Sequence, residues 1–282
     1  MILPDSFQFS QGNLQDYVDC PRRFQLRYVR RLRWPAVEAE PALENERYLQ
    51  QGAAFHRLVH QHLTGIPAWE LSRTVASREL RLWWHNYLEG HPKDLPSNRH
   101  PEVALSTPIG QSRLVARYDL VALDTGRRAV IVDWKTTRRR PERAWLLGRL
   151  QTRVYPYLLV QAGAQLNSGV PIRPEQVTMM YWFASFPADS ECVYYNSDQY
   201  RADHRHLNGL VAEIRERFEA LNEDRLLPCA GDERSCQYCR YRSLCQRGVE
   251  AGSLDEMLGE AASEDPFDFG IDFEQIAELE YR

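Results

Sequence analysis

Residues 129–141, AVIVDWKTTRRRP, end an apolar run with an aspartate, a tryptophan and a lysine. Lysine is rare in this chain, which has only Lys93 and Lys135, so a lysine two residues from Asp133 needs a reason. Side chains alternate between the two faces of a strand, so Asp133 and Lys135 are expected on one face. A lysine there can orient or deprotonate a water molecule, or stabilise charge that develops on a phosphate. Arginine does this poorly because it stays protonated. The spacing alone also fits a surface ion pair at the end of a strand.

A second aspartate, Asp119, is expected opposite Asp133. Residues 112–123 and 128–135 are β-type runs, and an Asp-Thr-Gly-Arg turn between them predicts a hairpin. This hairpin pairs the two aspartates, with their Cβ atoms roughly 4.5–5.5 Å apart. Two carboxylates in direct opposition repel each other unless something offsets their charge. A divalent cation such as Mg²⁺, which prefers oxygen ligands, would do so.

The elements that must position these residues follow from the apolar pattern. Helical segments and short strands alternate in the order α, β-meander, α, β, β, α. This order predicts an α/β domain with a small mixed sheet, flanked by helices and preceded by a helical N-terminal part. The expected helices begin after Ser10 and at Pro21 and cover 45–63, 69–88, 142–163 and 199–222, the last capped by Ser197 or Asp198. The expected strands cover 102–109, 112–123, 128–135, 176–184 and 191–196.

Length and composition predict a globular protein with a sizeable core. The 282 residues, 43% of them hydrophobic, are enough to bury a sizeable core in one large domain with additions. The sequence has no run of about 18 apolar residues, so no membrane span or membrane partner is expected. The N-terminus lacks the basic and apolar regions of a signal peptide, and a cytoplasmic location is therefore expected.

Charge is distributed unevenly along the chain. Residues 250–282 carry a net charge of −10, which leaves +6 on residues 1–249 within the net −4 of the whole chain. A basic body suggests a polyanionic partner, although +6 over this length is also an ordinary value. We predict a folded domain at 1–248 and an acidic tail at 249–282 that is partly disordered or docks onto a partner.

Several separated motifs occur in an order that resembles a known family. Arg117-Tyr118-Asp119 precedes the IVDWKT stretch that contains Asp133 and Lys135, GAAFH ends at His56 upstream, and Gln151 and Tyr155 form a Gln-x3-Tyr pair downstream. Together they resemble the PD-(D/E)XK nuclease superfamily, and in particular its RecB-like branch. The family's usual glycine before the arginine is Ala116 here. The resemblance covers roughly residues 7–247.

The resemblance implies a restriction-endonuclease-like core and a complete set of site residues. The metal, Mg²⁺ or Mn²⁺, would be held by His56, Asp119, Asp133 and the backbone carbonyl of Trp134. The catalytic set would be Asp119, Asp133, Lys135, Gln151 and Tyr155, with the last two facing the scissile strand. Glu102 is a weaker candidate for a further carboxylate near the site. The implied activity is a metal-dependent DNA nuclease, and specifically an exonuclease on DNA ends or single strands that uses a metal-activated water.

Three of the six cysteines form a cluster, Cys236-x2-Cys239-x5-Cys245, which is one ligand short of a four-thiolate site. Cys229 nearby or Cys20 far upstream could complete it, and four cysteines suit zinc as well as an iron–sulfur cluster. The segment YVDCPRRF around Cys20, together with the C-terminal triad, resembles the iron staple of AddB-type and CRISPR-associated RecB-like nucleases. This resemblance implies a [4Fe–4S] cluster on Cys20, Cys236, Cys239 and Cys245, a C-terminal staple that closes the domain.

Arginines gather within residues 22–33, 138–140 and 234–242, the last group interleaved with Tyr238 and Tyr241. Arginine contacts phosphate and stacks on bases, so DNA is the expected partner. Recombination repair beside a helicase and CRISPR spacer processing with adaptation proteins are the two contexts. The helicase would be a separate chain, because this one lacks a G-x-x-x-x-G-K-[ST] motif. The alternative is a non-catalytic DNA-binding module, or an accessory subunit of a helicase–nuclease, with a structural zinc or iron–sulfur site.

Overall fold

The computed structural model describes residues 3–32, 42–222, 224–231, 236 and 239–248. The acidic tail predicted at 249–282, together with Arg234 and Tyr238 of the third basic group, lies outside the described residues. In the described part of the chain, no helix combines the length and the apolar character that crossing a bilayer requires.

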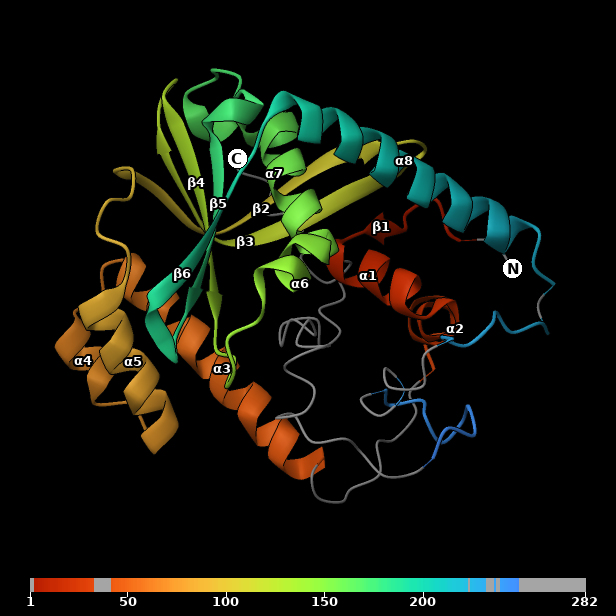
Figure 1. The fold of residues 1–282 in the computed structure, drawn as a ribbon, viewed down its shortest axis with the longest axis horizontal. Coiled ribbons are helices and arrows are strands. Elements are labelled where there is room, and N and C mark those ends of the chain that lie inside the picture. The colour runs from red at the N-terminus through yellow and green to blue at the C-terminus, as the bar shows by residue number, and fades with distance from the viewer. Residues whose placement is uncertain (1–2, 33–41, 223, 232–235, 237–238, 249–282) are drawn as a thin grey trace, which may run out of the picture.

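A mixed sheet forms the centre of the described structure (Figure 1). Its strands are β1 (Gln8–Phe9), β2 (Asn98–Ile109), β3 (Ser112–Asp124), β4 (Arg128–Lys135), β5 (Val177–Phe183) and β6 (Phe186–Tyr194). They run in the order β1-β3-β4-β5-β6, and β2 pairs with β3. The β2/β3, β3/β4 and β5/β6 pairs are antiparallel, whereas β1/β3 and β4/β5 are parallel. A mixed sheet flanked by helices confirms the predicted fold class.

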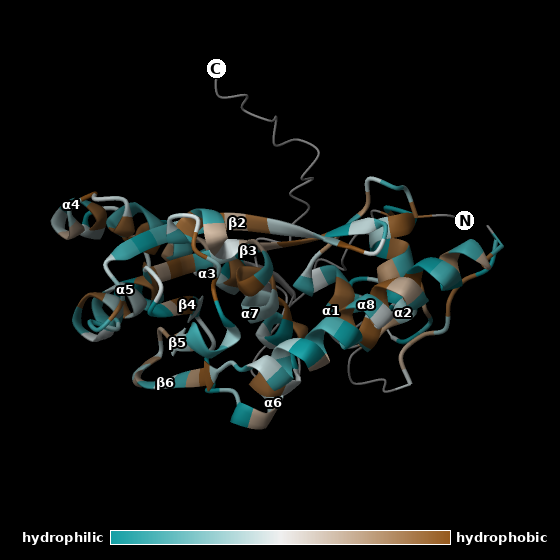
Figure 2. Cartoon of the chain, turned by 90° about the horizontal axis from the view of Figure 1, so that it is seen from above, coloured by the Kyte–Doolittle hydropathy of each residue, from teal (hydrophilic) through white to brown (hydrophobic). Residues whose placement is uncertain are grey.

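Helices cover both faces of this sheet (Figures 1 and 2). They are α1 (Gln11–Asp19), α2 (Pro21–Phe24), α3 (Ala42–Leu63), α4 (Ala68–Ser72), α5 (Arg78–Gly90), α6 (Arg143–Gly148), α7 (Leu150–Ala162) and α8 (Ser197–Glu219). A π-helical turn (Gln25–Val29) and two 3₁₀ turns (Gly163–Asn167 and Pro174–Gln176) complete the described elements. Helix α8 carries hydrophilic residues along much of its length in Figure 2, as expected of a helix that buries one stripe.

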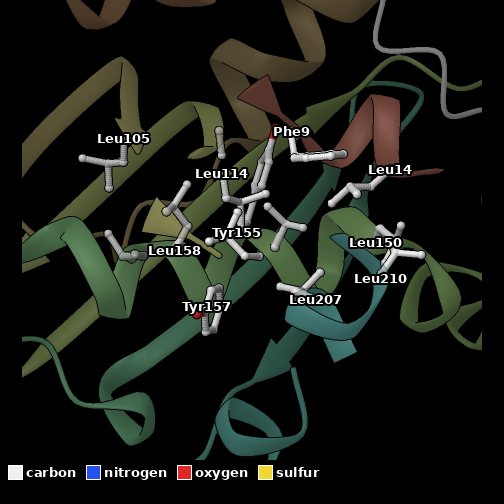
Figure 3. Packing of buried hydrophobic residues seen from close by; sticks show 14 of the residues in the cluster. Phe9, Leu14, Leu105, Leu114, Leu150, Tyr155, Tyr157, Leu158, Leu207 and Leu210 are labelled. Atoms are coloured by element: carbon white, nitrogen blue, oxygen red, sulfur yellow. The ribbon is translucent and has the colours of Figure 1, made fainter. Parts of the chain in front are cut away.

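The central strand β4 is buried on both faces, because a hydrophobic cluster packs against each of them. Its residues Ala129 and Ile131 belong to one buried cluster, with α1, α7 and α8. The alternate residues Val130 and Val132 belong to a second cluster, with α3 and α5. Because successive side chains point to opposite faces, a strand that is covered on both faces needs a continuous apolar run, and AVIV supplies it. Figure 3 shows part of the first cluster, including Leu150 and Leu158 of α7 and Leu207 and Leu210 of α8.

Four expected elements differ from the structure. The single helices expected at 69–88 and 142–163 are each two helices, and Arg149, with φ −79° and ψ 142°, is the extended residue between α6 and α7. Helix α8 is capped by Asn196, whose side chain accepts a hydrogen bond from the Gln199 amide, and not by Ser197 or Asp198. Strand β6 begins at Phe186, five residues earlier than expected. The sequence pattern does not show where these helices and strands begin and end, because several neighbouring residues are equally suited to be the cap or the first residue of the element.

Candidate active site

The register of the central hairpin brings the two aspartates to the same end of the sheet. The β3/β4 ladder pairs Leu120 with Val132, and the next step along it leads to Asp119 and Asp133, as predicted. The Asp119 carboxylate also accepts a hydrogen bond of 2.8 Å from the backbone amide of Trp134. Asp119 is therefore fixed to the backbone of the strand that carries Asp133.

Three residues from three elements form a candidate metal site around Asp119. His56 on α3 lies with Nδ1 3.2 Å from Asp119 Oδ1. One ligand atom each of His56, Glu102 on β2 and Asp119 lies within 4.8 Å of the others. An imidazole with two carboxylates is a donor set that suits Mg²⁺ or Mn²⁺. The structure thus groups His56 with Asp119, as expected, and also includes Glu102, which the sequence indicated only weakly.

A second set of contacts lies beside that group and joins Lys135, Asp133 and Gln151 to one another. Lys135 Nζ lies 2.8 Å from Asp133 Oδ2 and donates a hydrogen bond of 3.0 Å to Gln151 Oε1. The Gln151 amide, at the start of α7, donates to Asp133 Oδ1 at 2.6 Å. Asp133 and Lys135 therefore share a face of β4, as strand parity predicts. Because the ammonium is held by two partners, its position relative to the aspartates is well defined.

Burial and neighbouring charges shift the pKa values of the three carboxylates, Asp133, Glu102 and Asp119, by different amounts and in different directions. Burial raises the pKa of Asp133 to about 6; Lys135 opposes this shift, and Asp119 adds to it. Burial and then the Asp119 charge raise the pKa of Glu102 above its ordinary value. Burial alone would raise the pKa of Asp119 too, but His56, the Trp134 amide and Lys135 together lower it. Asp119 therefore stays ionised to lower pH than Asp133 or Glu102.

Two predicted site residues occupy supporting positions. Tyr155, one turn after Gln151, is 2% exposed and donates its hydroxyl hydrogen to the Arg117 carbonyl at 2.8 Å. It therefore lies behind the site, on the backbone that leads to Asp119. The Trp134 side chain packs in the second core cluster, while its amide binds Asp119. Metal ligation by the Trp134 carbonyl and a catalytic role for Tyr155 stay predictions.

A buried contact from α1 holds the start of α7. The Leu150 amide, the first of the helix, donates to Gln15 Oε1 at 2.9 Å, and Gln15 Nε2 in turn donates to Asp19 at 2.7 Å. The residue before α7, Arg149, provides no side-chain cap. Gln15 thus serves as the cap for the helix whose second residue is Gln151. Nothing in the sequence indicated this contact, because its partners are 135 positions apart.

The arginines after β4 have different surroundings. Arg138 lies with its guanidinium carbon 4.5 Å from the centre of the Tyr48 ring. Arg140 lies 2.9 Å from Glu191 on β6, and Arg139 is exposed. Arg139 and Arg140 are both exposed, and of these two Arg140 is engaged by Glu191.

The predicted cysteine ligands line one cavity. Cys20, Cys236, Cys239 and Cys245 share it with Cys229. The Ala230 amide donates to Cys20 Sγ at 3.3 Å, which joins the start of the chain to the segment that follows α8. Burial raises the pKa of the Cys239 and Cys245 thiols, which keeps them protonated unless a cation offsets the charge of the thiolates. This all-sulfur donor set fits either zinc or an iron–sulfur cluster.

The chain matches a nuclease superfamily over most of its length. The model of the PD-(D/E)XK nuclease superfamily matches residues 8–246, and the chain belongs to this superfamily. Its reaction class is therefore hydrolysis of phosphodiester bonds, and divalent metals are the general cofactors of the superfamily.

Solved structures resemble the chain over most of its length. The crystal structure of SSO0001 is 14% identical, with 86% of this chain and 87% of that chain covered and a TM-score of 0.41. A candidate exonuclease from Eubacterium rectale is 8% identical, with 78% and 89% covered and a TM-score of 0.48. Among curated proteins, none matches this sequence.

Proposed function

We propose that this chain is a metal-dependent deoxyribonuclease of the RecB-like branch, acting as an exonuclease on DNA ends or single strands. The observation that supports the proposal most is the contact set of Asp133, Lys135 and Gln151 beside His56 and Asp119. A module that only binds DNA has no need of a half-buried lysine held between a carboxylate and a side-chain amide. The site residues are those named from the sequence, with Glu102 added.

In this proposal His56, Asp119 and Asp133 hold Mg²⁺ or Mn²⁺ with the Trp134 carbonyl. The cation supplies Lewis-acid activation of the attacking water and of the phosphate when it is bound. As an ammonium, Lys135 would donate a hydrogen bond to the attacking water and offset charge on the phosphate oxygens; as a neutral amine, it would take the proton of that water and become the ammonium that offsets this charge. Gln151 orients Lys135 and Asp133 at once, because its amide contacts both side chains.

The cysteine cavity is proposed to hold a [4Fe–4S] cluster on Cys20, Cys236, Cys239 and Cys245, with zinc as the competing occupant. The cavity lies between the start of α2 and the segment 227–230, which hydrogen bonds already join: Arg22 donates to the carbonyls of Leu227 and Pro228. A cluster there would therefore stabilise an existing contact between distant parts of the chain.

DNA is the proposed partner, in recombination repair beside a separate helicase or in CRISPR spacer processing with adaptation proteins. End-labelled single-stranded and double-stranded DNA, incubated with Mg²⁺ or Mn²⁺, tests the activity directly. We expect stepwise shortening that chelation by EDTA stops. Intact DNA under all of these conditions, with DNA binding retained, would favour the alternative of a non-catalytic module or accessory subunit.

The capping contact of Gln15 leads to a prediction. Gln15→Leu leaves the buried Leu150 amide without its acceptor, at a cost of about 1–3 kcal/mol of stability. Because Gln151 is the next residue, we expect kcat for DNA digestion to fall about 10- to 100-fold with little change in KM. Gln199→Leu, on the exposed start of α8, is the matched control and should behave as the wild type. Equal kcat in both variants would contradict the assignment.

A pH dependence follows from the raised pKa of Asp133. A cation binds the ionised carboxylate, so the affinity for Mn²⁺ should fall as the pH drops through about 6. One proton on one ligand gives a limiting change of about tenfold per pH unit. Lys135 lowers this pKa, so Lys135→Ala should move the midpoint to higher pH. Calorimetric titration with Mn²⁺ at several pH values measures both; an affinity that stays constant across this range would contradict the prediction.

A further inference from the structure

The cysteine cavity holds one thiol more than a four-thiolate site needs. The thiols that line it are those of Cys20, Cys229, Cys236, Cys239 and Cys245. Zinc and [4Fe–4S] sites take four cysteines. The Ala230 amide donates a hydrogen bond of 3.3 Å to Cys20 Sγ, and such a bond favours the thiolate, which is the form that binds metal. Cys20 is therefore suited to be the fourth ligand, and Cys229 is the additional thiol.

Cys229 lies in contact with one of the proposed ligands. The thiols of Cys229 and Cys245 are hydrogen-bonded to each other. Both residues are partly exposed, whereas Cys236 is buried, so a small oxidant can reach this pair from solvent. All of the cavity cysteines are free thiols in the structure. Two free thiols in contact are arranged for the chemistry that joins them in a disulfide.

The backbone on either side of the pair is anchored to the same region of the protein. The carbonyl of the residue before Cys229 accepts a hydrogen bond of 3.2 Å from the Arg22 amide on α2. The Cys245 amide donates to the Tyr241 carbonyl at 2.9 Å, and the Tyr241 hydroxyl donates to the Leu32 carbonyl at 2.9 Å. Contacts with α2 and with the chain that follows it therefore bring the two thiols together.

We propose that Cys229 and Cys245 form a reversible disulfide when the cavity holds no metal, and that this bond blocks metal loading until it is reduced. The inference rests on the metal site proposed for this cavity and is independent of the nuclease activity. While the bond lasts, Cys245 is lost as a ligand, so the cavity keeps three of its four thiolates. In a reducing compartment, a disulfide of this kind is transient and senses oxidants.

Hydrogen peroxide is a sufficient oxidant for this step. Its O–O bond breaks, it takes up two electrons and the two protons of the thiols, and it leaves as two molecules of water while one S–S bond forms. A thiol reductant reverses the step by thiol–disulfide exchange, in which the reductant is oxidised to its own disulfide. The cycle thus returns both cysteines to the form that the structure shows.

A disulfide within the Cys236-x2-Cys239 pair is the competing outcome of oxidation, and a tryptic digest distinguishes the two. Trypsin cuts after arginine, which places each member of the proposed pair on a peptide of its own and both members of the competing pair on one peptide. These peptides are 226–234, 243–247 and 235–240, respectively. The proposed bond therefore links two peptides, whereas the competing bond links none.

Disulfide mapping tests the bond itself. The full chain, made metal-free by chelation under reducing conditions, is treated with hydrogen peroxide, alkylated and digested without reductant. Mass spectrometry should find peptide 226–234 joined to peptide 243–247, and dithiothreitol should separate them. Cys192→Ser, on β6 outside the cavity, is the matched control and should form the same linked peptide. Absence of the linked peptide, or an internal disulfide in 235–240 in its place, would overturn the inference.

Calorimetric titration with Zn²⁺ alone tests the block on loading. The reduced metal-free chain should bind Zn²⁺, lose this binding after peroxide treatment and regain it after reduction with a phosphine. Cys229→Ser cannot form the bond, so it should bind Zn²⁺ as the reduced wild type does, before and after peroxide. Loss of Zn²⁺ binding by reduced Cys229→Ser would make Cys229 a ligand and overturn its role as the additional thiol.

Two further outcomes separate this inference from the proposed site. If the linked peptide forms and the oxidised wild type still binds Zn²⁺ with unchanged affinity, the block on loading is overturned. If no reduced chain binds Zn²⁺ and reconstitution with iron and sulfide also yields no visible absorbance, the proposed metal site and the block fall together. DNA digestion with Mg²⁺ or Mn²⁺, measured on the same preparations, tests the proposed nuclease activity separately.

Discussion

Replacing Lys135 with alanine is expected to slow DNA hydrolysis by about 10²- to 10⁴-fold, the range for loss of a positioned proton-transfer group. The ammonium lies 2.8 Å from Asp133 and 3.0 Å from the Gln151 carbonyl oxygen, so alanine removes the one side chain that both partners hold. Initial rates on end-labelled DNA with Mn²⁺ measure the effect. DNA binding, followed by fluorescence anisotropy, should persist because the exposed arginines remain.

The chain offers a matched control in its other lysine. Lys93 is exposed and donates to the Leu88 carbonyl, so Lys93→Ala repeats the chemical change at a distance from the aspartates. Lys135→Arg separates charge from proton transfer, because arginine keeps the charge and does not act as a base. We expect it to be nearly as slow as Lys135→Ala. A wild-type rate in Lys135→Ala would contradict the catalytic assignment. A wild-type rate in Lys135→Arg would show that the lysine acts only through its positive charge and not by proton transfer.

The parts of this site that could be predicted depend on local sequence. A hairpin with a recognisable turn fixes its register within a few residues, so the opposition of Asp119 and Asp133 follows from counting outward from the turn. Strand parity then places Lys135 with Asp133. The fold class follows in the same way, since AVIV must be covered on both faces and the flanking amphipathic segments are the elements that can cover it.

The parts that could not be predicted depend on contacts between distant segments. The break at Arg149 is stable because Gln15, on another helix, accepts the Leu150 amide, and neither residue carries a signal of this partnership. The positive φ of Glu102 within β2 is likewise not indicated by its own strand, and its carboxylate is paired with Arg117 on the neighbouring strand. A sequence pattern reports what a residue prefers, whereas both features are cases in which tertiary contacts override the preference.

Replacing Cys20 with alanine is expected to remove the bound metal or cluster and to cost more than about 4 kcal/mol of stability, which is typical of a lost metal site. For a domain of this size the midpoint of thermal unfolding should fall by roughly 8–16 °C. Cys20 lies at the junction of α1 and α2, and its sulfur accepts the Ala230 amide. Visible absorbance, iron and zinc analysis and thermal unfolding measure the effect. Cys192→Ala, on β6 outside the cavity, is the matched control.

The same experiment decides which four of the five cavity cysteines are ligands. Cys229 lines the cavity beside Cys245, so it competes with Cys20 for the fourth position. If Cys20 is the ligand, Cys229→Ala should keep the metal content and most of the stability. If Cys229→Ala loses the metal while Cys20→Ala keeps it, the assignment passes to Cys229. The structural consequence then differs, because a ligand at position 20 joins the two ends of the domain, whereas one at position 229 closes only a short C-terminal loop.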